Sequence, residues 1–247
     1  MGAPFVSRSR PAFYALEPGG WRDYLTLLHP PYTLWHLSYV AIGAALAPHF
    51  VTNRLVVALA AFFLAVGIGA HALDELKGHP LQTRISDRTL VWLSAVSIAG
   101  AVALGIYGSI AYTPWLAPLV AVGAFVVVAY NLELFGGAFH SDLWFALDWG
   151  SFPLLVGYVA MAERISLGAV FAAAFAGFMS LAQRQLSTQV RTVRRRVASV
   201  SGTVELVDGR REPVTDATLI GAPEAALRAM TYAVISLAVG LVLLRLI

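Results

Sequence analysis

Seven long runs of apolar residues, separated by shorter polar segments, dominate the chain. They cover residues 33–50, 55–73, 90–112, 115–132, 143–162, 166–182 and 225–247. Each approaches the roughly 20 residues that an α-helix needs to cross a bilayer. Runs such as VVALAAFFLAVGIGA are apolar on every side, whereas the strands of a membrane barrel alternate polar and apolar residues. The pattern therefore predicts an all-α, polytopic membrane helix bundle of about seven spans.

One long polar stretch, residues 183–224, precedes the last apolar run. Within it two β-prone runs flank Asp208-Gly209, a strong signal for a two-residue hairpin turn. Further on, Gly221, Pro223 and Glu224 follow the order that is typical of a helix start. We therefore expect a small cytoplasmic β-hairpin and then a final helix. The predicted organisation is an interfacial segment (1–32), a core of six spans (33–185), a basic segment with the hairpin (186–224) and a C-terminal span (225–247).

Composition agrees with the membrane assignment. Of the 247 residues, 58% are hydrophobic and only 13% are charged, whereas a soluble domain has about 25% charged residues. Soluble enzyme folds are therefore excluded. The chain has no cysteine, which excludes disulfides, thiolate metal sites, iron–sulfur clusters and cysteine nucleophiles. The net charge of +3 comes from positive residues clustered in short stretches, and no nucleic-acid partner is implied.

Lysines and arginines outside the apolar runs indicate the orientation, because positive residues near span ends resist translocation. With a cytoplasmic N-terminus, only Arg54, Arg164 and Arg245 of the 17 lysines and arginines fall on the opposite side. Of the 14 acids, only Glu163 does so. Aromatic residues among the first arginines, such as Phe5, favour a segment at the membrane surface. We expect an integral protein surrounded by membrane lipid, in a prokaryotic cytoplasmic membrane, with its C-terminus outside.

The second apolar run ends in HALDELKGHPLQTRISDR, which carries a candidate site. His71, Asp74 and Glu75 stand at i, i+3 and i+4, a spacing that places them on one face of a helix. Two carboxylates and an imidazole can bind a divalent cation, or hold the hydrated magnesium that accompanies a diphosphate. The alternative is that these residues cap and solvate a helix end.

A second group of polar residues lies around the fourth and fifth runs. Asn131 and Glu133 stand at the membrane boundary, and His140 and Asp142 follow after a glycine pair. Asp142 is equally well explained as the N-cap of the fifth span. Asp148 lies about two turns inside that span, where an ionisable group costs roughly 2.5 to 3.5 kcal/mol. Such an acid normally faces the bundle interior and marks a substrate, ion or proton site; the alternative is a residue of the aromatic belt near the membrane interface.

Basic residues on the same side suggest an anionic ligand. Lys77, Arg84 and Arg88 surround the acidic face, while Arg184, Arg191 and the run 194–196 follow the sixth span. Carboxylates for a metal together with bases for free oxygen atoms suit a diphosphate. For residues 194–196, orientation by the positive-inside rule and attraction to lipid headgroups is the stronger explanation.

Two segments resemble the UbiA superfamily of intramembrane prenyltransferases. DELKGHPLQTRIS, from Asp74 to Ser86, is similar to the end of that family's first aspartate-rich motif. Tyr130 to Pro153 is similar to the segment that joins its fourth and fifth spans, and with the order of spans the resemblance covers about residues 33 to 190. It implies a helical bundle with a cytoplasm-facing cavity that is open to lipid. Magnesium and an allylic diphosphate would bind there, and a prenyl cation would alkylate an acceptor.

The chain also departs from the family pattern. His71 stands where the family has asparagine, and Glu75 follows Asp74 directly. SLAQRQLSTQ, without an acid, replaces the second aspartate-rich motif, and seven runs replace nine spans. Glu133, Asp142 and Asp148 are candidates to supply the missing acids.

We carry three hypotheses. The leading one is a UbiA-like membrane enzyme that acts on an isoprenoid or other lipophilic small molecule. Its site residues fall into three groups: Asp74, Glu75 and Asp148 as catalytic residues; Lys77, Arg84, Arg88, Tyr130, Asn131 and Arg184 as substrate-binding residues; and His71, Asp74, Glu75, Glu133, His140 and Asp142 as metal ligands. The second is a membrane enzyme with zinc or iron on those acids and on His36, His71, His79 and His140. The third is a non-enzymatic transporter or scaffold subunit, in which Asp148 and Glu133 line a path.

Overall fold

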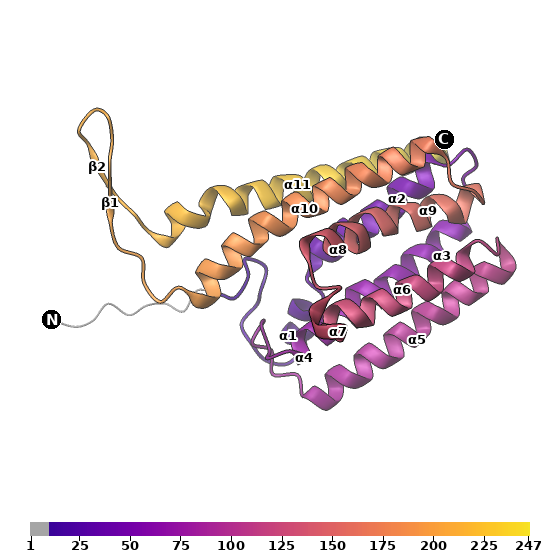
Figure 1. The fold of residues 1–247 in the computed structure, drawn as a ribbon, viewed down its shortest axis with the longest axis horizontal. Helices are drawn as coiled ribbons and strands as arrows, with labels where there is room; N and C mark the ends of the chain where they lie inside the picture. Colours follow the sequence, from indigo (N-terminus) through magenta and orange to yellow (C-terminus); the bar gives the residue numbers. More distant parts are fainter. Residues whose placement is uncertain (1–9) are drawn as a thin grey trace.

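The helices of the structure follow the apolar runs and lie side by side in one bundle (Figure 1). A computed structural model describes residues 10–247, so Phe5 and Arg8 of the predicted interfacial segment lie outside the described residues. In chain order the helices are α1 (Trp21–Leu27), α2 (Pro30–Leu46), α3 (Thr52–Phe62), η1 (Phe63–Ala70), α4 (His71–Leu76), α5 (Asp87–Ala111), α6 (Leu116–Asn131), α7 (Leu134–Gly137), α8 (Asp142–Ala146), η2 (Leu147–Ser151), α9 (Phe152–Ala162), α10 (Leu167–Arg196) and α11 (Asp216–Leu246). The prediction of an all-α membrane bundle is thereby confirmed at the level of fold class.

Five continuous helical stretches among residues 10–247 are long and apolar enough to cross a membrane. They are Thr52–Leu76, Asp87–Ala111, Asp142–Ala162, Leu167–Arg196 and Asp216–Leu246. The runs predicted at 33–50 and 115–132 form α2 and α6, which are shorter, with 17 and 16 residues. At about 1.5 Å per residue, α6 is only about 24 Å long. The count of seven spans therefore stays a prediction.

Two of the long stretches contain a π-helical segment. The first continues from α3 through η1 to α4, and the second from α8 through η2 to α9. A π-helical turn has one residue more than an α-helical turn, so it leaves some backbone carbonyls free for other donors and redirects the side chains that follow. Both effects are used in the site described below.

The last two helices differ from the sequence prediction. α10 does not end near residue 182 but continues to Arg196, so the first part of the predicted basic segment is helical. α11 begins at Asp216 rather than near Gly221, because Thr215 forms a capping box with Thr218. Pro223 therefore lies inside the helix.

A proline inside a helix leaves the carbonyl four residues earlier without its N–H donor. Here that carbonyl belongs to Leu219, and it accepts a hydrogen bond of 2.9 Å from Gln189 Nε2 on α10. The neighbouring helix thus supplies the donor that Pro223 lacks.

The predicted hairpin is confirmed. Strands β1 (Thr203–Glu205) and β2 (Arg211–Pro213) pair in antiparallel register, with Val204 opposite Glu212. Gly209 in the connecting turn has φ +81°, a conformation that glycine adopts without strain.

α2 packs closely against α9 in the interior of the bundle. A Cβ on Gly43 would lie 1.9 Å from the carbonyl oxygen of Leu154, and one on Gly157 would lie 2.1 Å from that of Val40. The absence of side chains at these two glycines lets the backbones touch. Trp35 and Tyr39 of α2 are fully buried in the same core.

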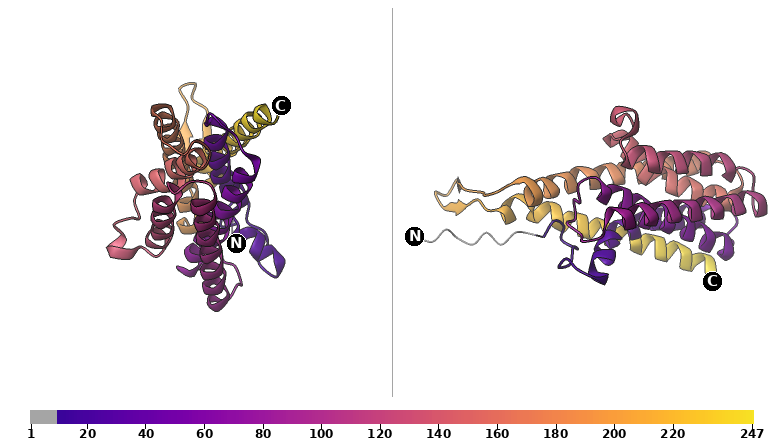
Figure 2. Two further views of the ribbon diagram at one scale, coloured as in Figure 1. Left: turned by 90° about the vertical axis from the view of Figure 1, so that its right-hand side faces the viewer. Right: turned by 90° about the horizontal axis from the view of Figure 1, so that it is seen from below.

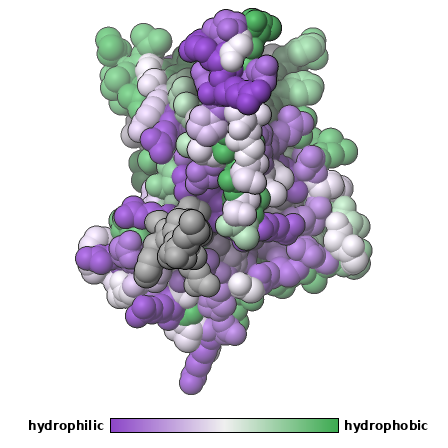
Figure 3. Space-filling model, turned by 90° about the vertical axis from the view of Figure 1, so that its left-hand side faces the viewer, coloured by the Kyte–Doolittle hydropathy of each residue, from purple (hydrophilic) through white to green (hydrophobic). Residues whose placement is uncertain are grey.

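The two ends of the bundle differ in character. The hairpin, α1 and α7 lie at one end, and the C-terminus lies at the other (Figure 1). α10 and α11 extend beyond the other helices toward the hairpin (Figure 2). Hydrophilic side chains gather on this end of the molecule (Figure 3). The polar cavity described next belongs to it.

Candidate functional site

A polar cavity of about 300 Å³ lies among α2, η1, α4, α6, α10 and the segment Pro11–Tyr14. Eight of the predicted site residues line it: His71, Asp74, Lys77, Tyr130, Asn131, Glu133, His140 and Arg184. His29, His36, Gln183, Arg191 and Arg195 also line it. Side chains from distant parts of the sequence thus meet in one space.

Positive charge exceeds negative charge in this lining. Its basic residues are Lys77, Arg184, Arg191 and Arg195, whereas its carboxylates are Asp74 and Glu133. Glu133 is paired with Lys77, 2.9 Å from Nζ to Oε2. The hydrogen bond from Lys77 lowers the pKa of the Glu133 carboxyl, which keeps Glu133 ionised. Asp74 is then the one carboxylate among the described lining residues that is outside an ion pair.

Arg184 is held in place by two side chains. Its Nε donates to Asp142 Oδ1 at 2.5 Å, and its Nη1 donates to the hydroxyl oxygen of Tyr130. Ser141 is the N-cap of α8, so the cap role proposed for Asp142 belongs to its neighbour. Asp142 itself does not line the cavity but orients a residue that does.

Three histidines of the cavity share one hydrogen-bonding pattern. Nδ1 of His36, His71 and His140 lies 2.7, 3.2 and 3.1 Å from the carbonyl oxygens of Trp149, Gly67 and Tyr130. A carbonyl only accepts, so Nδ1 carries a proton, and in the neutral form of the ring Nε2 keeps a lone pair. Gly67 lies in η1 and Trp149 in η2, so π-helical carbonyls fix two of these rings.

His29 forms a second layer beside His71. The two imidazoles stack, with ring centroids 4.1 Å apart and planes 8° apart. His29 Nδ1 lies 2.9 Å from the hydroxyl of Tyr14, and its buried Nε2 has no hydrogen-bond partner among the described residues. Burial lowers the pKa of His29 well below its usual range. His29 is therefore neutral at physiological pH.

The N-terminal segment borders the cavity and is held by the end of α10. Arg195 Nε donates to the carbonyl of Pro11 at 3.2 Å, and Arg194 Nη1 donates to that of Arg10 at 3.3 Å. Arg194 is also paired with Glu224 at 2.5 Å. At least two of the arginines in the run 194–196 thus have specific contacts, in addition to the orientation and lipid attraction expected from the sequence.

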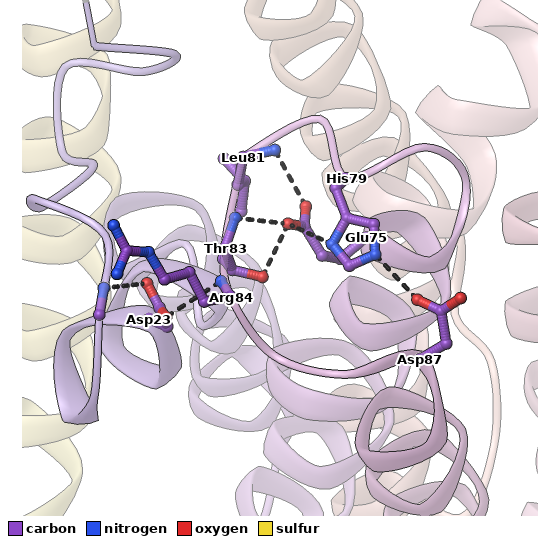
Figure 4. A network of polar contacts seen from close by, with 8 residues as sticks. Asp23, Glu75, His79, Leu81, Thr83, Arg84 and Asp87 are labelled. Atoms are coloured by element: carbon purple, nitrogen blue, oxygen red, sulfur yellow. Dashed lines mark hydrogen bonds and ion pairs between the residues drawn. The ribbon is translucent and has the colours of Figure 1, made fainter.

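Glu75 does not line the cavity, although Asp74 beside it does. Its fully buried carboxylate accepts hydrogen bonds from Leu81 N (2.9 Å), Thr83 N (3.0 Å) and Thr83 Oγ1 (2.8 Å) (Figure 4). These bonds fold the loop 77–86 onto the end of α4. Glu75 is therefore a structural residue of this loop, which differs from the catalytic and metal-ligand role we predicted.

Asp23 fixes the other side of the same loop. Its carboxylate accepts from Gly19 N at 2.9 Å and from Arg84 N at 3.0 Å (Figure 4). The side chains of Arg84 and Arg88 are exposed and do not line the cavity. His79 belongs to the loop, and its Nε2 lies 2.8 Å from Asp87 Oδ1. Of the three bases predicted to surround the acidic face, only Lys77 lines the cavity.

Asp148 lies in a separate, apolar cleft. Its lining comes from α3, η1, α5, α6, η2 and α9, and the cleft volume is about 110 Å³. Val66 and Trp149 line both the cleft and the polar cavity and so form the wall between them. Asp148 therefore does not join the other predicted acids.

Several residues of the cavity were missed or undervalued at the level of sequence. Gln183 and Arg184 occupy the place of the family's second aspartate-rich motif, and both line the cavity, as do Ser187 and Arg191. Their spacing along one face of a helix was readable in the sequence. His29 gave no such signal, because it precedes a proline pair at a helix start.

Comparisons with protein-family models, curated proteins and solved structures find no match for this chain. The likeness to the UbiA superfamily therefore rests on the motifs quoted above. Among residues 10–247, no three His, Asp or Glu side chains lie close enough to hold one metal ion among themselves.

Proposed function

We propose that the protein is an integral membrane enzyme that binds the anionic head of a lipophilic substrate, an isoprenoid diphosphate, in the polar cavity. The observation that carries this proposal is the excess of positive charge in a cavity at the end of an apolar helix bundle. Arginine and lysine bind phosphate oxygens through charge-assisted hydrogen bonds, which are about twice as strong as neutral ones. The apolar part of such a substrate suits the surrounding membrane.

Arg191 and Arg195 are the best candidates for direct contact with the anion. Arg191 donates to Thr188 Oγ1 at 3.1 Å and Arg195 to the carbonyl of Pro11, both neutral acceptors. Neither guanidinium forms an ion pair within residues 10–247. Their charge is thus free to neutralise a ligand, whereas Arg184 and Lys77 are already paired with acids.

Asp74 is the candidate ligand for magnesium. Mg²⁺ is usually bound by one or two carboxylates together with the phosphates of a substrate, so one free carboxylate beside an anion site fits this ion. When bound, the ion would draw negative charge from the diphosphate. Zinc or iron is the second candidate, because histidines with Nδ1 bonded to a carbonyl present Nε2 in the form that binds metals. Since no three such side chains of residues 10–247 lie close enough to hold one ion, water or substrate would have to complete its coordination.

The resemblance to the UbiA superfamily suggests prenyl transfer as the reaction. The bond between the allylic carbon and the diphosphate oxygen would break, and the diphosphate would leave with the electron pair. The acceptor would bond to the carbon and release a proton. Arg191 and Arg195 would stabilise the leaving diphosphate, and the lone pair on His71 Nε2 could take the proton.

Binding of farnesyl diphosphate to the purified protein in lipid nanodiscs, with magnesium present, tests the proposal. We expect Arg191→Gln and Arg195→Gln each to weaken binding at least about tenfold, which corresponds to about 1.4 kcal/mol. Arg211→Gln is the matched control, because Arg211 lies on the exposed hairpin and pairs with Glu205. Farnesol, which lacks the anion, should not compete. Equal affinity of the wild type for farnesol and farnesyl diphosphate would refute the proposal.

Prenyl transfer is tested separately, by supplying labelled farnesyl diphosphate and a lipid extract as the source of acceptors. Formation of labelled lipid that is lost in Asp74→Asn supports an enzyme. If diphosphate binds but no product forms with any acceptor or metal, the cavity is a binding site alone. Elemental analysis of gently purified protein decides on zinc or iron.

A further inference from the structure

The apolar cleft between α3, α5, α6 and α9 contains one unsatisfied acid. Its lining is aliphatic and aromatic apart from a few polar groups, and its charged residues are Asp148 and Arg54. Arg54 is engaged: its Nη1 lies 2.9 Å from Glu163 Oε1 and 3.0 Å from the carbonyl oxygen of Ala160. Asp148 is 8% exposed, and its Oδ2 has no hydrogen-bond partner among the described residues.

An unpartnered buried carboxyl oxygen is costly. A buried polar group that lacks its hydrogen bond loses its hydration without compensation, and an acid inside a membrane span costs more than a neutral group. Buried polar groups in native structures nearly always have a partner, so each exception requires an explanation. A ligand that brings a donor into the cleft would supply the partner.

The backbone around Asp148 also has the features of a functional site. Asp148 and Trp149 lie in η2, and Ala65 and Val66 of η1 line the same cleft. π-helical segments occur frequently at functional sites and redirect the side chains that follow them. Two such segments, from different helical stretches, border this one cleft.

We infer that the cleft binds an apolar molecule that carries a hydroxyl group, a phenol or an alcohol, with Asp148 as the hydrogen-bond partner of that hydroxyl. A hydroxyl suits Asp148 in either protonation state, because an ionised carboxylate accepts from it and a neutral carboxyl also donates to it. An ammonium ligand suits the cleft less, because it would have to lose far more hydration and would share the lining with Arg54.

The dimensions of the cleft limit the ligand. An engineered apolar cavity of about 150 Å³ binds benzene, so a cleft of about 110 Å³ limits the ligand to one small ring or a short chain. The inference is independent of the proposed function, because Val66 and Trp149 separate the cleft from the polar cavity and no basic residue of that cavity takes part.

The test compares 4-methylphenol with toluene, which has the same ring and methyl group without the hydroxyl. Binding to the full-length protein in nanodiscs is measured with labelled probes, and partition into empty nanodiscs is subtracted. We expect the wild type to bind 4-methylphenol at least about tenfold more tightly than toluene. Asp148→Leu should reduce this preference to about one while toluene still binds. Asp208→Leu is the matched control, because it makes the same change at an acid of the exposed hairpin, outside both the cleft and the polar cavity, and it should keep the preference.

A second variant tests the inference independently, in case Asp148→Leu does not fold. Ala124 lines the cleft from α6, and Ala124→Phe should fill it and abolish binding of both probes while leaving Asp148 in place. A wild type without preference for the phenol, a preference that persists in Asp148→Leu, or saturable phenol binding in a folded Ala124→Phe protein would each overturn the inference. Binding of farnesyl diphosphate in the same samples reports on the polar cavity and so separates failure of this inference from failure of the proposed function.

Discussion

Replacement of Glu75 by glutamine should release the loop that borders the candidate site. The carboxylate of Glu75 accepts one hydrogen bond from Leu81 N and two from Thr83, and it is fully buried. Glutamine keeps one acceptor oxygen, which can face Thr83, but it turns an NH₂ group toward the N–H of Leu81. The variant therefore loses at least one bond to a charged acceptor and leaves a buried donor without a partner.

The size of this loss follows from the number of bonds. A hydrogen bond to a charged group contributes about 1.5–3 kcal/mol, and a buried unpaired donor costs about 1–3 kcal/mol. Because these terms overlap, we expect the free energy of opening the loop to fall by about 2–3 kcal/mol. At about 1.4 kcal/mol for each factor of ten, the open population rises about 30- to 150-fold.

Amide hydrogen exchange at Leu81 and Thr83 measures this opening directly, since protection reports the free energy of local opening. Glu163→Gln is the control, because Glu163 pairs with Arg54 away from this loop and its replacement should leave exchange at residues 81 and 83 unchanged. Unaltered protection in Glu75→Gln would refute the conclusion that Glu75 holds the loop, and would return Glu75 to the list of candidate ligands.

Two further predictions concern the loop and the last helix. A hydrogen bond to Asp87, with a smaller contribution from Glu75, raises the pKa of His79. Protonated His79 therefore stabilises the loop below the unfolded pKa of about 6.5, and this contribution is lost as the pH rises through the folded value. Hydrogen exchange in the loop should be slower at about pH 6 than at about pH 8 once the intrinsic rate is corrected, and Asp87→Asn should reduce the difference. Gln189→Leu should lower the free energy of unfolding by about 1 kcal/mol, because the carbonyl of Leu219 then lacks a donor. The same change should cost little in a Pro223→Ala background, where residue 223 regains its N–H. Equal losses of stability in the two backgrounds would contradict this account.

The sequence predicted the elements that depend on local patterns. The apolar runs give the helices, and Asp208-Gly209 gives the hairpin turn, because both signals lie within a few consecutive residues. Hydropathy falls after residue 182, so the sequence predicts that α10 ends there. In the structure Gln183, Ser187 and Val190 continue one buried face of the helix. The start of α11 was misplaced because Pro223 suggested a beginning, whereas Thr215 provides the cap.

The site was predictable only where the spacing of residues along a helix determines which way their side chains point. His71 and Asp74 do face one cavity, as their spacing indicated. Glu75 shares that spacing, but the donors of Leu81 and Thr83 come from a loop whose path no local pattern encodes. Asp148 lies in a different cleft, which depends on the packing of several helices and on a π-helical turn. Hydrophobicity alone carries no information about such a turn.

We have proposed that the arginines of α10 bind a diphosphate in the polar cavity. The most direct measurement is an experimental structure of the protein in nanodiscs with magnesium and the unreactive analogue farnesyl thiodiphosphate. We predict density for two phosphorus atoms within hydrogen-bonding distance of Arg191 and Arg195, with the prenyl chain directed toward the membrane. A saturated sample in which the diphosphate binds elsewhere, with this cavity filled only by water or by the protein's own side chains, would contradict the account.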